Sequence, residues 1–374
     1  MKKAINMKEK NWFLSLVLVF LAFYFMPVGS QWMNNPLLSG FALLHEYATQ
    51  HILTCLVPAF FIAGAIVVFV KKQSVLKYLG GKAKAYISYP IASVSGAVLA
   101  VCSCTILPLF AGIYKRGAGL GPAITFLYAG PAINIAAIFL TASVLGFEIG
   151  LARAVSAIVL AVLIGLTMAF LFREKSAKQE IVIEEEAGQK ISKSSIGLFF
   201  ASMVGIIIVN GLPIELTLKW AAMGFLALVA VGIVSWKFKT ETRNKWLSET
   251  WSISKLLIPY LFIGVFLVGV IEPLIPEQMV VQLVGSNTIQ ANLLASIIGA
   301  FMYFSTLTEV PIMQALMEKG MNQGPALTLL LAGPSLSLPA MLVVRKVLGN
   351  KKTVAYITIV VAYSSIAGFI FGMI

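Results

Sequence analysis

Long apolar runs without a single charged residue alternate along the chain with short charged segments. Most runs approach the length of about 20 residues that an α-helix needs to cross a bilayer. None shows the alternation of a half-buried strand, and a segment inside a bilayer must satisfy its own backbone, so the runs predict helices. The charge-free runs are 11–45, 52–70, 85–114, 117–147, 154–172, 194–214, 220–236, 256–271, 278–308, 320–344 and 353–374.

Two of these runs, 85–114 and 278–308, are too long for one span and too short for two. As straight helices they would measure roughly 45 Å, against about 30 Å of hydrocarbon. A re-entrant hairpin fits better, because its two half-helices enter and leave by the same face. We therefore expect re-entrant hairpins with broken helices at 85–116 and 278–319.

The composition indicates that these helices belong to an all-α polytopic membrane protein. Hydrophobic residues make up 59% of the 374 residues, charged residues make up 11%, and the mean hydropathy is +0.92. A soluble domain carries about 25% charged residues, so this chain has too little polar surface for a water-soluble fold. The net charge of +13 would suggest nucleic acid in a soluble protein. In a membrane protein it marks cytoplasmic loops, so no nucleic-acid partner is expected beside the lipid bilayer.

The distribution of Lys and Arg supports the two hairpins. If every run spanned once, basic residues would be divided almost evenly between the two sides of the membrane. With the hairpins, 25 of the 28 Lys and Arg residues fall on the side of the N-terminus, and only Arg153, Lys219 and Lys319 fall on the other. Basic residues favour the cytoplasmic side, so we expect about nine transmembrane helices in the cell inner membrane, with a cytoplasmic N-terminus.

The chain also repeats itself. The segment from Gly121 to Pro131 recurs from Gly324 to Pro334, 203 residues later, and Gly117 matches Gly320 at the same offset. The first hairpin opens to the cytoplasm and the second to the outside, so the repeats are inverted. Inverted repeats with interrupted helices are typical of secondary transporters, although duplication can also build only a scaffold. We expect a first repeat at 1–172, a charged cytoplasmic loop at 173–193, a linking helix at 194–214 and a second repeat at 215–374.

A pair of cysteines, Cys102 and Cys104, lies inside the first hairpin, shortly before Pro108. On a regular helix two such side chains point about 200° apart, so they converge on one ligand only where the backbone is broken. Thiolates prefer soft partners such as a trivalent metalloid, a cuprous ion or a sulfur species. The alternative is that both are small buried hydrophobes, which is also how we interpret Cys55.

The second hairpin carries Glu309 where the first has Ile106, and Ser305 where the first has Cys102. A carboxylate inside an apolar run is costly if unpaired and suggests a function. Glu309 is the candidate for proton coupling or for gating a cationic solute. The alternative is that it lies nearer the interface and accepts hydrogen bonds from Thr306 or from the backbone.

Gly-Pro pairs interrupt two further runs, at Gly130 and Gly333. A half-helix that begins after such a break has a positive N-terminal end, which attracts an anion or a thiolate-bound solute. The alternative is an ordinary kink whose polar side chains satisfy freed backbone groups. The residues expected to line the solute site are Cys102, Ser103, Cys104, Thr105, Pro108, Asn134, Ser305, Thr308, Ser335 and Ser337.

The cysteine hairpin, followed by a Gly-Pro helix and Asn134, and duplicated without cysteines, resembles the ArsP/YraQ-like permease family over residues 45–374. That family includes efflux permeases for trivalent organoarsenicals, whose thiols are held to bind the arsenic. The resemblance implies a permease role for Cys102 and Cys104, with a soft metalloid as ligand.

The expected function is export of a soft, thiol-reactive solute, first of all a trivalent arsenical, by a secondary permease without cofactor or enzymatic activity. One alternative is a permease for another small solute, such as a sulfur compound or an anion. A passive channel is another. A membrane thiol-redox enzyme is the third, but the chain has no Cys-x-x-Cys. Substrate, direction, coupling ion and oligomeric state stay open.

Overall fold

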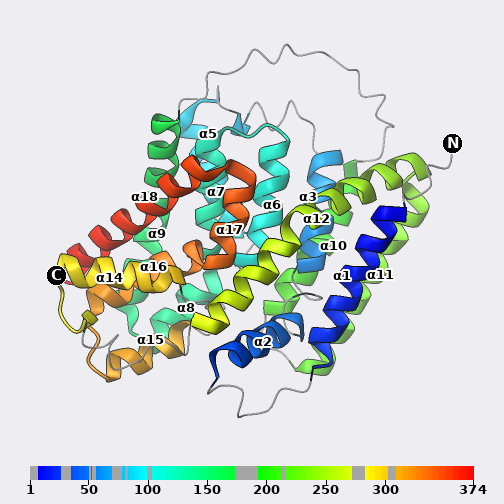
Figure 1. Ribbon diagram of the computed structural model, residues 1–374. Helices are drawn as coiled ribbons and strands as arrows, with labels where there is room; N and C mark the ends of the chain where they lie inside the picture. Colours follow the sequence, from blue (N-terminus) through cyan, green and yellow to red (C-terminus); the bar gives the residue numbers. More distant parts are fainter. Residues whose placement is uncertain are drawn as a thin grey trace.

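The computed structural model describes residues 7–26, 35–49, 52, 56–69, 78–80, 83–98, 103–172, 193–211, 215–271, 283–301 and 309–374. Over these ranges the chain is all-helical, with sixteen α-helices and no strand (Figure 1). This confirms the expected fold class as far as an all-α polytopic membrane protein.

Four helices are long and apolar enough to cross a membrane. Two further spans are formed if each of two bent helix pairs counts as one, which gives six. The number nine stays a prediction. The four long helices are α9 (Phe147–Leu171), α11 (Leu216–Lys237), α12 (Thr240–Ile271) and α18 (Asn350–Phe371).

The two bent pairs lie where the Gly-Pro breaks predict them. Helices α7 (Leu120–Ala132) and α8 (Ile135–Val144) meet at 43°, and α16 (Gln323–Leu336) and α17 (Leu338–Leu348) meet at 48°. In each pair a proline lies near the end of the first helix, where it removes a backbone donor and disturbs the preceding turn.

Both runs expected as hairpins are divided into two short helices. The first contains α5 (Ala85–Val98) and α6 (Ser103–Lys115), and the second contains α14 (Ile289–Phe301) and α15 (Glu309–Glu318). The segments between them, 99–102 and 302–308, lie outside the described residues. Whether each pair is re-entrant remains a prediction.

The run 11–45 differs from its expected single span. It contains α1 (Met7–Tyr24) and α2 (Pro36–Tyr47) as separate helices. Asn35 accepts a hydrogen bond from the backbone N–H of Leu37, and Pro36 occupies the first turn, which are both strong signals for a new helix start. The remaining helices are α3 (Val57–Phe69) and α10 (Lys193–Gly211).

Helix bounds in the two halves match at the offset of the sequence repeat, so that α7, α8 and α9 correspond to α16, α17 and α18. We call two positions that are 203 residues apart twins. Gly117 and its twin Gly320 have φ of 105° and 108°, and Gly146 and its twin Gly349 have φ of 106° and 84°. Only glycine adopts this left-handed region without steric cost, so the same turns recur in both halves.

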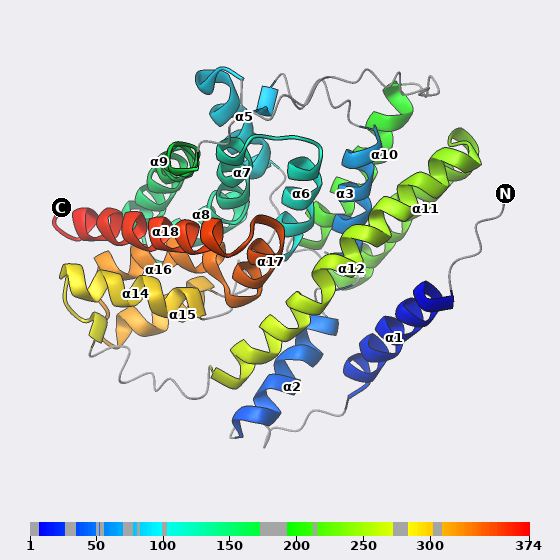
Figure 2. The same cartoon turned by 45° about the horizontal axis from the view of Figure 1, so that its top comes forward.

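Helices α7 and α16 form the centre of the molecule. Every residue from Leu120 to Ala132 is buried, as is every residue from Gly324 to Leu336. Helix α7 packs against α5, α6 and α9, while α16 packs against α14, α15 and α18, and the two central helices contact each other. Figures 1 and 2 show both of them enclosed by other helices.

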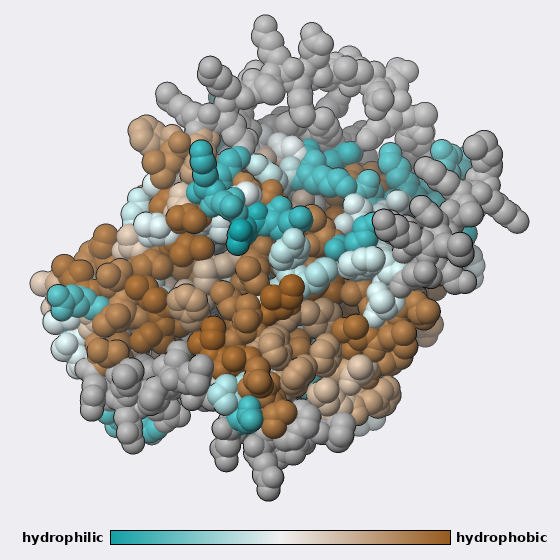
Figure 3. Space-filling model, viewed as in Figure 1, coloured by the Kyte–Doolittle hydropathy of each residue, from teal (hydrophilic) through white to brown (hydrophobic). Residues whose placement is uncertain are grey.

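The outer helices expose apolar side chains instead of burying them. Phe170 of α9, Phe225 of α11 and Val354 of α18 are all exposed. Figure 3 shows a broad hydrophobic belt on this face, with hydrophilic residues gathered towards its upper side. An exposed belt of this kind is what a helix bundle presents to lipid.

Candidate functional site

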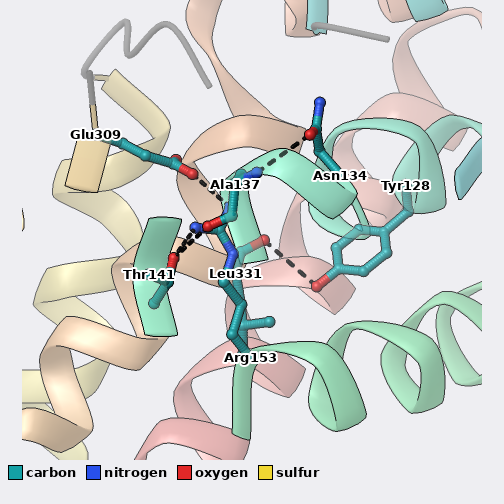
Figure 4. A network of polar contacts seen from close by, with 7 residues as sticks. All are labelled: Tyr128, Asn134, Ala137, Thr141, Arg153, Glu309 and Leu331. Atoms are coloured by element: carbon teal, nitrogen blue, oxygen red, sulfur yellow. Dashed lines mark hydrogen bonds and ion pairs between the residues drawn. The ribbon is translucent and has the colours of Figure 1, made fainter. Parts of the chain in front are cut away.

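A fully buried ion pair connects Arg153 of α9 with Glu309, the first residue of α15 (Figure 4). Nη2 of Arg153 donates to Oε1 of Glu309, and Nη1 donates to Oγ1 of Thr141 over 2.8 Å. The Thr141 hydroxyl donates in turn to the carbonyl oxygen of Ala137 over 2.7 Å. The chain of contacts thus fixes the guanidinium inside the first half.

The two charges stabilise each other in a place where each alone would be expensive. A buried ion costs several kcal/mol unless it is paired, and its hydrogen-bonding atoms need partners. Among the described residues, Nε of Arg153 and Oε2 of Glu309 have no such partner. The pair therefore keeps unused hydrogen-bonding capacity at the centre of the protein.

The surroundings of Glu309 are polar on one side. The carboxylate is buried in the protein, and its observed partner is a guanidinium. Glu309 is also the first residue of α15, where the positive end of the helix dipole favours a negative charge.

The charge pattern places Arg153 between two spans, whereas the structure places it within a helix. The residue lies inside α9, which begins at Phe147, and its side chain is fully buried. The available signal was the one that singles out Glu309, namely a lone charge within an apolar segment. Charge counting hides that signal because it treats every basic residue beside an apolar run as a loop residue.

A second polar contact joins the halves at a pair of twins. The hydroxyl of Tyr128 donates to the carbonyl oxygen of Leu331 over 3.3 Å, and these positions are 203 residues apart. Two equivalent positions of the matching halves are therefore in contact. Tyr356, the twin of Arg153, is also buried and donates to the carbonyl oxygen of Ser335 over 3.3 Å.

Three predicted residues lie at the bends of the two broken pairs, and all three are buried. Asn134 caps α8 by accepting a hydrogen bond from the N–H of Ala137 over 3.2 Å. Ser337 precedes α17 without a side-chain cap bond. Ser335 lies in the last turn of α16, and its Oγ has no partner among the described residues. The side-chain oxygen of Asn134 thus satisfies a backbone N–H at the start of α8.

The structure describes only some of the site residues predicted in the first hairpin. Thr105 and Pro108 lie in α6, where Thr105 is buried. Ser103 and Cys104 begin this helix, but their side chains, like Cys102 and Cys55, lie outside the description. Ile106 packs so closely on Gly130 that an added Cβ there would be 2.6 Å from its Cδ1. The start of α6 therefore lies against the bend of α7.

Of the site residues predicted in the second hairpin, the structure describes Glu309. Ser305 and Thr308 lie outside the described residues. Within the described part of the chain, no group of three or more His, Cys, Asp or Glu side chains could hold a metal ion. The site that the structure does bring together is polar and charged: Arg153, Glu309, Thr141 and Tyr128, with Ser335 and Asn134 at the bends.

Comparisons with known proteins point in one direction. The ArsP_1 family, described as "Predicted permease", matches residues 37–373. The UPF0718 protein MJ0584 of Methanocaldococcus jannaschii is 45% identical over 345 residues, which cover 88% of this chain and 94% of that protein. The UPF0718 protein YraQ of Escherichia coli is 23% identical over 247 residues, which cover 66% of this chain and 56% of that protein. No solved structure matches.

Proposed function

Because the chain belongs to the ArsP_1 family of predicted permeases, we propose that it is a secondary permease that exports a soft, thiol-reactive solute from the cytoplasm. The observation that carries the proposal is the buried polar centre between two matching sets of broken helices. Secondary transporters bind their solutes near the midplane, where discontinuous helices from two repeats meet.

The repeats are inverted and the N-terminus is cytoplasmic in this proposal. The side of the N-terminus then holds both the end of α6 and the first turns of α12. In support, Lys115 at the end of α6 donates to Oε2 of Glu249 in α12 over 2.6 Å. Two segments whose basic residues are assigned to one side of the membrane therefore do lie together.

The solute is a trivalent arsenical bound by the thiols of Cys102 and Cys104. The support comes from the position of the motif: α6 begins at Ser103, at the end of the expected hairpin tip. Thiolates prefer soft partners, and a trivalent arsenical is such a partner.

The first test is the substitution Cys104→Ser in a host that is sensitive to trivalent arsenicals. We expect resistance to be lost while the amount of membrane-inserted protein is unchanged, because a hydroxyl does not replace a thiolate as a ligand for arsenic. Cys55→Ser is the matched control and should retain resistance. Full resistance of the Cys104→Ser variant would contradict thiol binding.

A second candidate is a permease for a small anion, and Arg153 favours it. Its guanidinium is fully buried, and its Nε has no partner in the described part of the chain. Everted vesicles would separate the candidates if uptake is measured for trivalent arsenicals, antimonite, selenite and sulfur oxyanions, each with and without a pH gradient. An anion permease takes up the oxyanions and tolerates Cys104→Ser.

A further inference from the structure

The ion pair between Arg153 and Glu309 connects elements from the two halves of the chain. Arg153 lies in α9, and Glu309 is the first residue of α15, 156 residues further along the chain. Both side chains are fully buried. A buried pair holds its two elements together only while both partners are charged, because a neutral partner leaves the other charge uncompensated.

Arg153 is held in place by residues of the first half alone. Nη1 of Arg153 donates to Thr141 of α8, and Thr141 donates to Ala137 one turn earlier. These three residues belong to the first half, so the guanidinium keeps this anchor when Glu309 is absent. Glu309 is thus the exchangeable partner (Figure 4).

The twin positions show that the fold does not need charges at such a place. The twin of Arg153 is Tyr356 and the twin of Glu309 is Ile106, and both are buried. Replacing a buried ion pair by apolar residues is often neutral or stabilising. An ion pair whose two twin positions carry neutral residues therefore requires an explanation other than stability.

Helix α15 is short and packs outside the main core. It has ten residues, and its buried Met313 and Leu316 belong to a small apolar cluster that is separate from the main core. Its other packing partners are α8 and α16. The ion pair adds a charged contact between the start of α15 and the first half.

Few other titratable groups face this pair. Helices α8 and α16 carry none. Glu148 at the start of α9 and Glu318 at the end of α15 are exposed, and Tyr128 of α7 donates its hydroxyl proton to Leu331. Within the described residues, Arg153 is the one charge that contacts the Glu309 carboxylate.

We propose that Arg153 is the coupling partner of Glu309 and that their ion pair is a proton-operated latch between α9 and α15. The inference rests on the proposed permease function and specifies how transport is coupled. When Glu309 takes up one proton from the outer side, its carboxylate becomes a neutral carboxyl and α15 separates from α9. Arg153 keeps its charge and its bond to Thr141. Release of that proton to the cytoplasmic side restores the carboxylate and closes the latch, so one proton moves inwards in each cycle.

The test is hydrogen–deuterium exchange of the full-length protein in detergent micelles, without solute, between about pH 5 and pH 8. After correction for the intrinsic exchange rate, exchange of α15 in the wild type should rise by up to about tenfold for each unit of falling pH, because opening takes up one proton. The variant with both Arg153→Gln and Glu309→Gln has no charge at the latch, and its α15 should lose this pH dependence.

A matched control comes from a second ion pair between the halves. Lys115→Gln with Glu249→Gln removes the pair between α6 and α12, which is partly exposed to solvent. This variant should keep the pH-dependent exchange of α15. A wild type without pH dependence, or a doubly neutral latch variant that retains it, would overturn the proposal.

A conservative variant keeps the test decisive if the doubly neutral protein does not fold. Arg153→Lys retains the charge but forms a weaker pair with the carboxylate. Glu309 should then take up its proton at higher pH, so the midpoint of the exchange profile shifts upwards. An unchanged midpoint overturns the latch.

Transport measurements distinguish a failure of the latch from a failure of the proposed function. In everted vesicles the doubly neutral variant should still move solute, but its rate should no longer respond to a pH gradient, whereas the Lys115 and Glu249 control responds as the wild type does. If the wild type moves none of the tested solutes while α15 exchanges as expected, the proposed function is overturned and the latch is supported.

Discussion

At the scale of single residues, Thr141 has a larger role than an ordinary threonine in a membrane helix. It accepts a hydrogen bond from a buried guanidinium and donates one to its own helix. Hydrogen bonds to charged groups contribute about 1.5–3 kcal/mol, against roughly 1 kcal/mol for neutral pairs. This one hydroxyl therefore adds to the stability of the packing between α9 and α8.

The substitution Thr141→Val removes this hydroxyl and preserves the shape of the side chain. We expect a loss of about 1.5–3 kcal/mol of stability, since the guanidinium stays buried with one hydrogen bond fewer. Thermal unfolding in detergent measures the effect. Ser143→Ala is the control, because Ser143 is exposed and donates only to Leu140 of the same helix. Equal unfolding temperatures for both variants would show that Thr141 does not support Arg153.

The sequence is informative about one of the two buried charges and misleading about the other. Glu309 stands inside a segment whose twin carries Ile106, so it is conspicuous. Arg153 directly precedes a charge-free run and therefore looks like a flanking residue. Helix α9 begins seven residues earlier than that run suggests, after Gly146 with its left-handed backbone. Their pairing could not be predicted, because it depends on the packing of elements far apart in the chain.

At the scale of elements, the two broken helix pairs are alike in shape but unlike in chemistry. Asn134 caps the second helix of its pair with a hydrogen bond, whereas Ser337 at the same place in the other pair does not. A cap of this kind contributes about 1 kcal/mol. The bend between α7 and α8 is thus the more firmly fixed of the two.

Asn134→Ala should therefore cost about 1 kcal/mol, and Ser337→Ala should cost distinctly less. The measurement is the unfolding temperature of each variant, with exchange of the first backbone amides of α8 and α17 as a local readout. A larger loss at Ser337 than at Asn134 would speak against a capping role for Asn134 and for a different role of both residues.

Local sequence signals predict breaks well and helix lengths poorly. The Gly-Pro pairs at Gly130 and Gly333 correctly predict two bent helices, since proline interferes with the turn before it. The run 11–45, in contrast, hides a helix start at Asn35 and Pro36 inside an uninterrupted apolar stretch. Hydropathy reports which segments avoid water, but capping decides where a helix begins.

At the scale of the whole molecule, the repeat in the sequence becomes a repeat in the structure. The twins Gly117 and Gly320, each with a left-handed backbone, are the clearest signs of the match. The expected orientation of the two halves relative to a membrane is inferred from the distribution of loop charges. The contact between Lys115 and Glu249 supports that inference.

Opposite locations of the two termini are the direct test of the inverted arrangement. A green fluorescent protein fused to the N-terminus should fluoresce, because it folds in the cytoplasm. An alkaline phosphatase fused to the C-terminus should be active, because it is active only outside the cytoplasm. Exchanging the two reporters serves as the control and should abolish both signals. Two termini on the same side would contradict the inverted arrangement.

The contact between Tyr128 and Leu331 has a consequence for how such a molecule can change by mutation. In a dimer of identical subunits, every substitution beside the symmetry axis appears twice, so a charge placed at one junction is also placed at the other. A single chain that contains both halves is free of this restriction. Arginine and glutamate occupy one junction, while tyrosine and isoleucine occupy the equivalent positions in the other. Joining the two halves in one gene thus allows one junction to specialise while the other conserves the neutral packing.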